Sequence, residues 1–162
     1  PQRLTEGILG PIKNKPVRLA DGAIISPSST ESNDKPSLWR VHFERSTDGG
    51  QTWTIVRPAL GGGNAPELHA IQPSVPVYPG GRLQAVGRTR AGRVFQTWSE
   101  DSGQTWAPLS LTALPNPSSG TDATTLRDGR QLLDAADRAL YRAKQAGRNL
   151  VVAVPLDEVS SR

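Results

Sequence analysis

Cysteine and methionine are both absent from the 162-residue chain, and histidine occurs only twice. The absence of cysteine excludes disulfides and thiolate metal sites, and two histidines leave little for a histidine-based metal centre. We therefore expect no cofactor and no bound metal. Because the chain starts at Pro1 and lacks methionine, we also expect a fragment or a processed form.

Long apolar runs are missing as well. No run approaches the roughly 18 apolar residues of a membrane helix, and no charged-then-apolar leader resembles a signal peptide. We therefore expect no membrane partner.

Positive charge is present but is not concentrated. The formal net charge is +4, and the densest basic stretch, residues 82–93, holds four arginines among small and polar residues. Proteins that bind nucleic acids usually gather their basic residues on one face or in one run, so we expect no nucleic-acid partner. A small anionic substrate needs only two or three convergent arginines or lysines, and this charge distribution favours that kind of partner.

Glycine and proline, in contrast, are abundant, with 16 and 14 copies. They separate short apolar runs, several of which alternate with polar residues as half-buried strands do. The region 1–133 is therefore predicted to be mainly β. Strands are expected at Val17–Leu19, Ala23–Ile25, Trp39–Phe43, Thr52–Val56, Leu83–Val86, Val94–Trp98 and Thr124–Leu126.

An internal repeat organises this region. The segment STDGGQTW at 46–53 returns as SEDSGQTW at 99–106. Tight-turn dipeptides that end at Gly22, Gly81 and Gly129 mark a second repeat. The period of about 50 residues corresponds to four strands, the size of one propeller blade. The sequence thus predicts a partial β-propeller of about two and a third four-stranded blades.

Each repeated turn has a structural interpretation. Asp48 and Asp101 can accept hydrogen bonds from backbone N–H groups of their own turns. Trp53 and Trp106 can bury an aromatic ring between blades. We interpret these four residues as structural, and we set aside the alternative that the two aspartates are catalytic.

The repeated pattern resembles the Asp-box, or BNR repeat, of sialidases and related β-propeller glycosidases. The resemblance spans about residues 8–133, and HFERSTDGGQTW and LPNPSSGTDATTLRDGRQLL are similar to segments of bacterial sialidase-like BNR proteins. It implies that the Asp-boxes lie on the outer face and that substrate binds on the opposite face. Because sialidases typically have six blades, it also implies a truncated propeller, which several copies of the chain could complete as a homo-oligomer. For the bacterial parent family the resemblance implies a secreted or periplasmic location, and the compartment of this chain stays open.

The resemblance implies a glycoside hydrolase that acts on an acidic glycan, with weak or no activity in this chain because most blades are missing. The Phe-Arg-Ile-Pro motif of true sialidases is absent, and residues 12–16 read IKNKP instead. Sialic acid is therefore not the favoured sugar, and cleavage by hydrolysis or by β-elimination stays open. The alternatives are a non-catalytic carbohydrate- or protein-binding β module and a non-functional chimera.

The order of strands expected in each blade places two kinds of loop on the substrate face. One kind precedes the first strand of a blade, and the other joins its second and third strands; residues 28–31 are expected to form a loop of the second kind. Glycosidases generally use two carboxyl groups, and Glu31 and Asp122 are the catalytic candidates. Each also has an ordinary interpretation, Glu31 as a solvated loop acid and Asp122 as a turn cap. The candidate substrate-binding residues are Lys13, Lys15, Gln72, Arg88, Arg90 and Asn116. His42 is interpreted as an ordinary strand histidine, and Glu44 is expected on the strand surface.

The chain changes character at its C-terminal end, 134–162, which we expect to form a separate helix–strand tail. The segment LLDAADRALYRAKQAGRNLVVAV, residues 132–154, resembles the final helix and strand of GGDEF diguanylate cyclase domains. Lys144 and Arg148 occupy positions that bind GTP phosphates in that family. The loop that names the family is absent, so cyclase activity is not expected.

Overall fold

A computed structural model describes residues 4–63 and 66–126. The described elements are β1 (Val17–Arg18), β2 (Ile24–Glu31), β3 (Trp39–Ser46), β4 (Thr54–Val56), β5 (Ala70–Ser74), the 3-10 helix η1 (Pro79–Gly81), β6 (Leu83–Thr89), β7 (Arg93–Ser99) and β8 (Ser110–Pro115). The predicted C-terminal helix and strand, and the turn at Gly129, lie outside the described residues.

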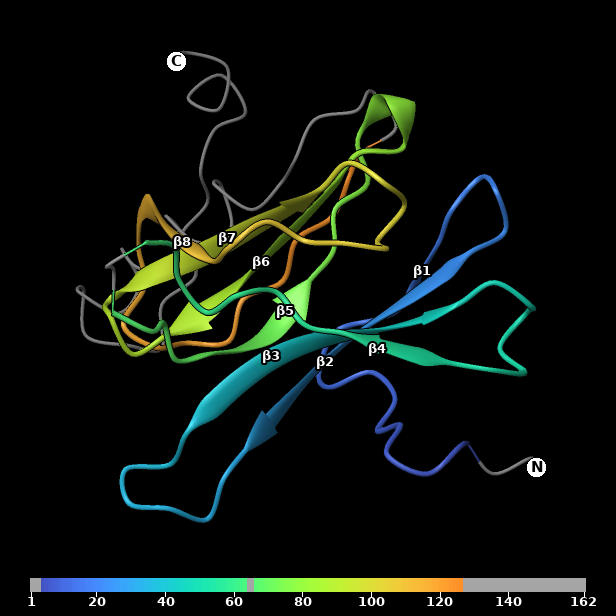
Figure 1. The fold of residues 1–162 in the computed structure, drawn as a ribbon. Helices are drawn as coiled ribbons and strands as arrows, with labels where there is room; N and C mark the ends of the chain where they lie inside the picture. The colour runs from blue at the N-terminus through green and yellow to red at the C-terminus, as the bar shows by residue number, and fades with distance from the viewer. Residues whose placement is uncertain (1–3, 64–65, 127–162) are drawn as a thin grey trace, which may run out of the picture.

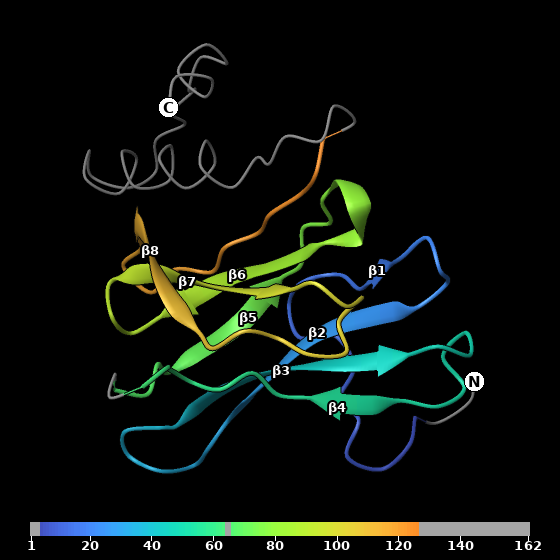
Figure 2. The same ribbon diagram turned by 45° about the horizontal axis from the view of Figure 1, so that its top comes forward.

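The strands form two antiparallel sheets, each of four strands in chain order: β1-β2-β3-β4 and β5-β6-β7-β8. Figures 1 and 2 show the two sheets packed one above the other, with β5 against β2 and β3. Each sheet contains one copy of the repeated turn, between β3 and β4 and between β7 and β8. The prediction of a mainly β chain built from four-stranded blades is therefore confirmed for the described residues.

Several predicted strand limits need correction. The segment 28–31 was expected to be a loop, but it belongs to β2, because its pairing with β3 continues to Glu31 opposite Trp39. The strands β5 and β8 were not predicted; Pro73 lies within the first, and the second ends at Pro115. Of the strand expected at Thr124–Leu126, only Thr125 has an isolated bridge.

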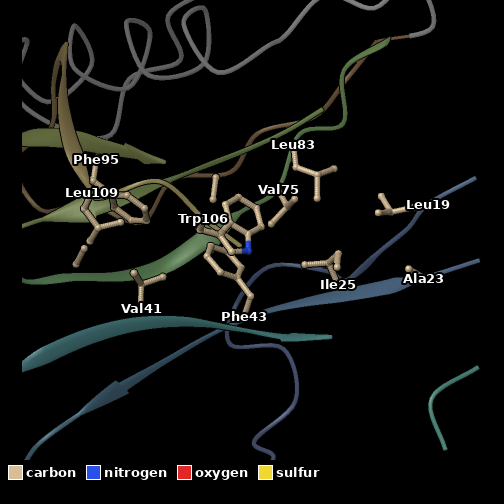
Figure 3. Packing of buried hydrophobic residues seen from close by; sticks show 12 residues of the cluster. Leu19, Ala23, Ile25, Val41, Phe43, Val75, Leu83, Phe95, Trp106 and Leu109 are labelled. Atoms are coloured by element: carbon tan, nitrogen blue, oxygen red, sulfur yellow. The ribbon is translucent and has the colours of Figure 1, made fainter. Parts of the chain in front are cut away.

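The core lies between the two sheets. Antiparallel pairing sends alternate side chains to the same face, so Ile25, Val41 and Phe43 of the first sheet face the second sheet. The Trp106 ring lies flat on the Phe43 ring, with centroids 3.8 Å apart and planes 15° apart (Figure 3). Trp106 is 8% exposed, whereas Trp53 is only half-buried. Of the two repeated tryptophans, Trp106 is thus the one that joins the described blades.

Candidate functional site

The Asp48 carboxylate is bound by its own turn. Its Oδ1 accepts hydrogen bonds from Ser46 Oγ at 2.8 Å, Gln51 N at 3.0 Å and Thr52 N at 2.9 Å. Its Oδ2 accepts one from Thr52 Oγ1 at 2.6 Å. These donors, the Thr52 hydroxyl first among them, hold the pKa of Asp48 far below its usual range. A carboxylate so occupied stabilises the turn and is not available for acid–base chemistry.

Asp101 has the same arrangement in the second sheet. It accepts hydrogen bonds from Ser99 Oγ at 2.8 Å, Thr105 N at 2.9 Å and Thr105 Oγ1 at 2.6 Å. Partial burial acts to raise the pKa of Asp101, but the Thr105 and Ser99 donors together outweigh it and lower the pKa. The two turns therefore share their serine and threonine donors, but Gln51 N donates to the Asp48 side chain, whereas Gln104 N donates to the Asp101 backbone oxygen.

We expect these two carboxylates to make the fold sensitive to acid. A carboxylate whose pKa is lower in the folded than in the unfolded chain contributes stability that is present above about pH 4 and is lost as the pH falls below it. Thermal unfolding of the double variant Asp48→Asn/Asp101→Asn should show a lower midpoint at pH 7 and a shallower decline between about pH 4 and pH 2. Asp21→Asn, which alters a turn acid outside the two Asp48 and Asp101 turns, is the control, and an unchanged acid decline in the double variant would contradict this account.

The opposite end of the sheets carries the sequence-predicted site. The β2–β3 hairpin tip at 32–38 and the β6–β7 turn at 90–92 lie at one end, and the aspartate turns lie at the other (Figure 1). A third segment, residues 116–122, leaves β8 at the hairpin end and is called here the 116–122 loop. Asn116 shapes this loop: its Nδ2 donates to Ser119 O at 3.1 Å, and its Oδ1 accepts from Ser119 N at 2.7 Å. At 1% exposure, Asn116 supports the loop and is not on its surface.

The 116–122 loop holds two of the predicted cationic side chains. Arg88 Nη1 donates to Ser118 O at 3.0 Å, and Lys13 Nζ donates to Thr121 O at 2.7 Å. The Lys13 stem crosses directly over Gly120, where an added Cβ would lie 2.7 Å from Lys13 Cε. Within residues 4–63 and 66–126, neither Arg88 nor Lys13 makes an ion pair.

A third cation joins them through Trp39. The guanidinium carbons of Arg88 and Arg90 lie 5.0 Å and 4.1 Å from the centre of the Trp39 ring. Arg90 Nη1 donates to Ser37 O at 2.7 Å, while Arg88 Nε is buried and has no acceptor in the described part of the chain. Two guanidinium groups therefore share one indole, and no carboxylate within ion-pair distance neutralises them in the described segments.

Asn14, next to Lys13, joins its own segment to those of Gln72 and Thr121. Its Nδ2 donates to Gln72 O at 3.0 Å and to Thr121 O at 3.3 Å, and its Oδ1 accepts from Lys13 Nζ at 3.1 Å. The predicted binding residue Gln72 enters this network through its backbone, in a left-handed conformation with φ 57°. The two acceptors of Asn14 Nδ2 are 58 and 107 residues away in sequence, so no local pattern indicates them.

The two predicted catalytic carboxylates lie in different settings. Asp122 Oδ1 accepts hydrogen bonds from Ser74 Oγ at 2.7 Å and from Ala123 N at 2.8 Å, which leaves Oδ2 as the oxygen open to a reacting group. Glu31 is exposed and stands opposite Trp39 at the end of β2. Lys15 is exposed, and no hydrogen bond or ion pair within the described segments links its side chain to the 116–122 loop. The loop thus gathers Lys13, Arg88 and Asp122, with Arg90 and Glu31 placed next to Trp39.

Glu44 does not lie on the strand surface, and that prediction is wrong. Its side chain has no exposed area, because the segment before β1 covers this face of β3: the carboxylate accepts hydrogen bonds from Leu9 N at 2.7 Å and Gly10 N at 2.9 Å. His42 is also buried, with Nε2 3.5 Å from Glu44 Oε1. Burial lowers the pKa of the His42 imidazole, an effect that the neighbouring Glu44 carboxylate opposes.

No group of three or more histidine, aspartate or glutamate side chains in the described segments is arranged to hold a metal ion. No helix of residues 4–63 and 66–126 has the length and apolar character that crossing a membrane requires.

A family model described as BNR repeat-like domain matches residues 1–159. The chain therefore belongs to this family, as the repeated turns and the two blade-like sheets indicate. The match also covers most of the C-terminal segment, whose likeness to cyclase domains and whose division from the rest at residue 133 stay predictions. No curated protein matches the sequence.

Solved structures share the fold. A protein of unknown function from Dyadobacter fermentans is 20% identical with a TM-score of 0.59, over 72% of this chain and 31% of that one. A variant of the NanB sialidase from Streptococcus pneumoniae is 24% identical with a TM-score of 0.52, over 72% and 17%. The intramolecular trans-sialidase from Ruminococcus gnavus is 23% identical with a TM-score of 0.51, over 71% and 24%. The chain thus spans less than a third of each of these proteins, and its described residues share their β fold.

Proposed function

We propose that this module binds an acidic glycan at the end of the sheets that carries the 116–122 loop. The observation that supports the proposal is the gathering of Lys13 and Arg88 on this one loop, with Arg90 beside Arg88 on Trp39. None of the three cations makes an ion pair within the described residues.

An acidic sugar fits this arrangement better than a neutral one. Like charges held close together repel, and an anion placed between them removes that cost. A guanidinium is planar and presents paired N–H donors that match a carboxylate, while the Lys13 ammonium has three donors and uses two of them on Thr121 O and Asn14 Oδ1. The third donor of Lys13 is available to the ligand.

Calorimetric titration tests the binding proposal. The probes are 3′-sialyllactose and a hexuronic-acid trisaccharide, with neutral maltotriose as the reference sugar. We expect saturable binding of at least one acidic probe and none of maltotriose. Arg88→Ala should weaken that binding about tenfold or more, the usual cost of losing a hydrogen bond to a charged group.

Arg82→Ala is the matched control for Arg88→Ala. Arg82 also lies on an indole, 4.0 Å from the centre of Trp98, but it pairs with Glu100 at 2.6 Å and follows η1 at the other end of the sheet. Equal losses in Arg88→Ala and Arg82→Ala, or equal binding of acidic and neutral probes, would refute the proposed site.

For the chemistry, we propose Asp122 and Glu31 as the carboxyl pair of a sialidase-like glycosidase, of which this module supplies part of the site. Cleavage of a glycosidic bond needs one group to protonate the leaving oxygen and a second to attack or to activate water. Asp122 Oδ2 is free of the bonds that fix Oδ1. We expect turnover by the chain to be slow, because two blades supply only a portion of such a site.

Turnover of acidic aryl glycosides separates the enzyme from a pure binding module. Asp122→Asn keeps an oxygen for Ser74 and Ala123, so it should retain the fold and abolish any turnover. Asp21→Asn, which alters another turn acid whose Oδ1 accepts from Ala23 N at 3.0 Å, should leave the rate unchanged. Binding of an acidic probe with no turnover in the unmodified chain would favour the non-catalytic module instead.

A further inference from the structure

Residues 9–12, which directly precede Lys13, are hydrogen-bonded at their start to a buried carboxylate. Glu44, in the middle of β3, accepts two backbone N–H groups from the segment before β1, those of Leu9 and Gly10. Ser26 Oγ, from the neighbouring strand β2, lies 3.4 Å from Glu44 Oε2. A buried carboxylate is stable only when donors satisfy it, and here two of the donors belong to the segment that it holds.

The two bonds from Leu9 N and Gly10 N to the Glu44 carboxylate are called here the Glu44 clamp. Only Pro11 and Ile12 separate Gly10 from Lys13. Ile12 N donates to Pro27 O at 3.0 Å, and Asn14 N donates to Ile12 O at 2.9 Å, so the backbone is fixed on both sides of Lys13. Lys13 itself has φ 71°, a left-handed conformation that is unfavourable for a residue with a Cβ. Such a conformation persists only where the surroundings enforce it. On the N-terminal side, the Ile12–Pro27 backbone bond and, before it, the buried Glu44 carboxylate hold the segment in place.

We infer that Glu44 is a positioning residue, which holds the 9–12 segment so that the Lys13 ammonium reaches Thr121 O and the anion-binding face. The inference rests on the proposed function, in which Lys13 contacts the acidic glycan. The Glu44 carboxylate binds the segment from β3, whereas the Lys13 ammonium bonds to the 116–122 loop, and no hydrogen bond or ion pair joins the two groups in the described residues. The effect of Glu44 on a ligand therefore passes through Lys13.

A double-mutant cycle on affinity tests the inference. Lys13→Ala should weaken binding of the acidic trisaccharide about tenfold, and Glu44→Gln, which replaces one acceptor oxygen by a donor, should produce most of the same loss. The double variant should bind no more weakly than Lys13→Ala, because Glu44 acts through Lys13. Both single variants should also reduce the dependence of affinity on salt, which a purely structural loss would leave unchanged.

Glu100→Gln is the matched control, because it makes the same chemical change in an exposed residue at the aspartate-turn end; it should leave affinity unchanged. Should Lys13→Ala weaken binding while Glu44→Gln does not, or should the two losses add, the positioning role is refuted. An unchanged affinity in Lys13→Ala refutes the proposed contact between Lys13 and the ligand instead.

Two ligand-free measurements keep the inference testable if Glu44→Gln folds poorly or no probe binds. In the unmodified chain, the amides of Leu9 and Gly10 should exchange with solvent much more slowly than that of Gly7. In Glu44→Gln, but not in Glu100→Gln, the NMR signal of the Lys13 ammonium should move toward that of a free lysine. Equally fast exchange at Leu9, Gly10 and Gly7, or an unmoved Lys13 signal, would overturn the clamp.

Discussion

Replacing Trp106 with alanine should lower the free energy of unfolding by about 3–5 kcal/mol, the usual cost of removing a large buried aromatic ring. The ring stacks on Phe43 at 3.8 Å and fills the space between the two sheets. Its loss removes apolar contacts and leaves a cavity that two hydrogen-bonded sheets cannot easily close. Urea denaturation followed by fluorescence or circular dichroism measures the loss.

Trp53→Ala is the matched control for Trp106→Ala, because Trp53 holds the same position in the first copy of the repeated turn. Trp53 is only half-buried, and its Nε1 donates within the turn to Gly50 O at 2.9 Å. We expect its replacement to cost less than half as much as Trp106→Ala, in proportion to the smaller area that it buries. Equal losses would show that Trp106 has no special role between the sheets.

The second large effect is expected for Gly103→Ala. Gly103 has φ +77°, and an added Cβ would lie 2.6 Å from Ile25 Cδ1 and 3.5 Å from Leu83 Cδ1. The substitution therefore combines an unfavourable left-handed backbone with overpacking between the sheets, and together these should cost about 2–4 kcal/mol. Thermal and urea unfolding both report this loss.

Gly50→Ala separates the two contributions. Gly50 is the equivalent residue of the first repeat, with φ +92°, but its added Cβ would lie 3.5 Å from the nearest atom, in the Trp53 ring. That distance is an ordinary contact, so only the backbone cost of about 1 kcal/mol is expected. If Gly50→Ala is as destabilising as Gly103→Ala, packing against Ile25 is not the cause.

The repeated turn was sufficient to predict the two sheets but not the packing between them. Its hydrogen bonds are all local, from residues two to four positions from the aspartate, and local spacing encodes them. Trp53 and Trp106 are identical in motif context, yet only Trp106 has a described sheet on its other side. Burial depends on that neighbour, which the motif does not specify.

The candidate site was predicted in part for the same reason. Blade register placed Lys13, Arg88 and Asp122 at one end of the sheets, and the structure joins them through the 116–122 loop. Register could not show that Asn116 is buried within that loop. Nor could it show the importance of Asn14 and Glu44, because their hydrogen bonds reach partners between 34 and 107 residues away.

The most direct test of the glycan-binding account is an NMR titration of the ¹⁵N-labelled chain with the acidic trisaccharide. The account predicts saturable shifts of backbone amides in the 116–122 loop and in residues 88–90, with those of the aspartate turn at 99–106 unmoved. The same titration with maltotriose should move neither set. Shifts centred on 99–106, or none with any acidic probe, would contradict the assignment of the binding face.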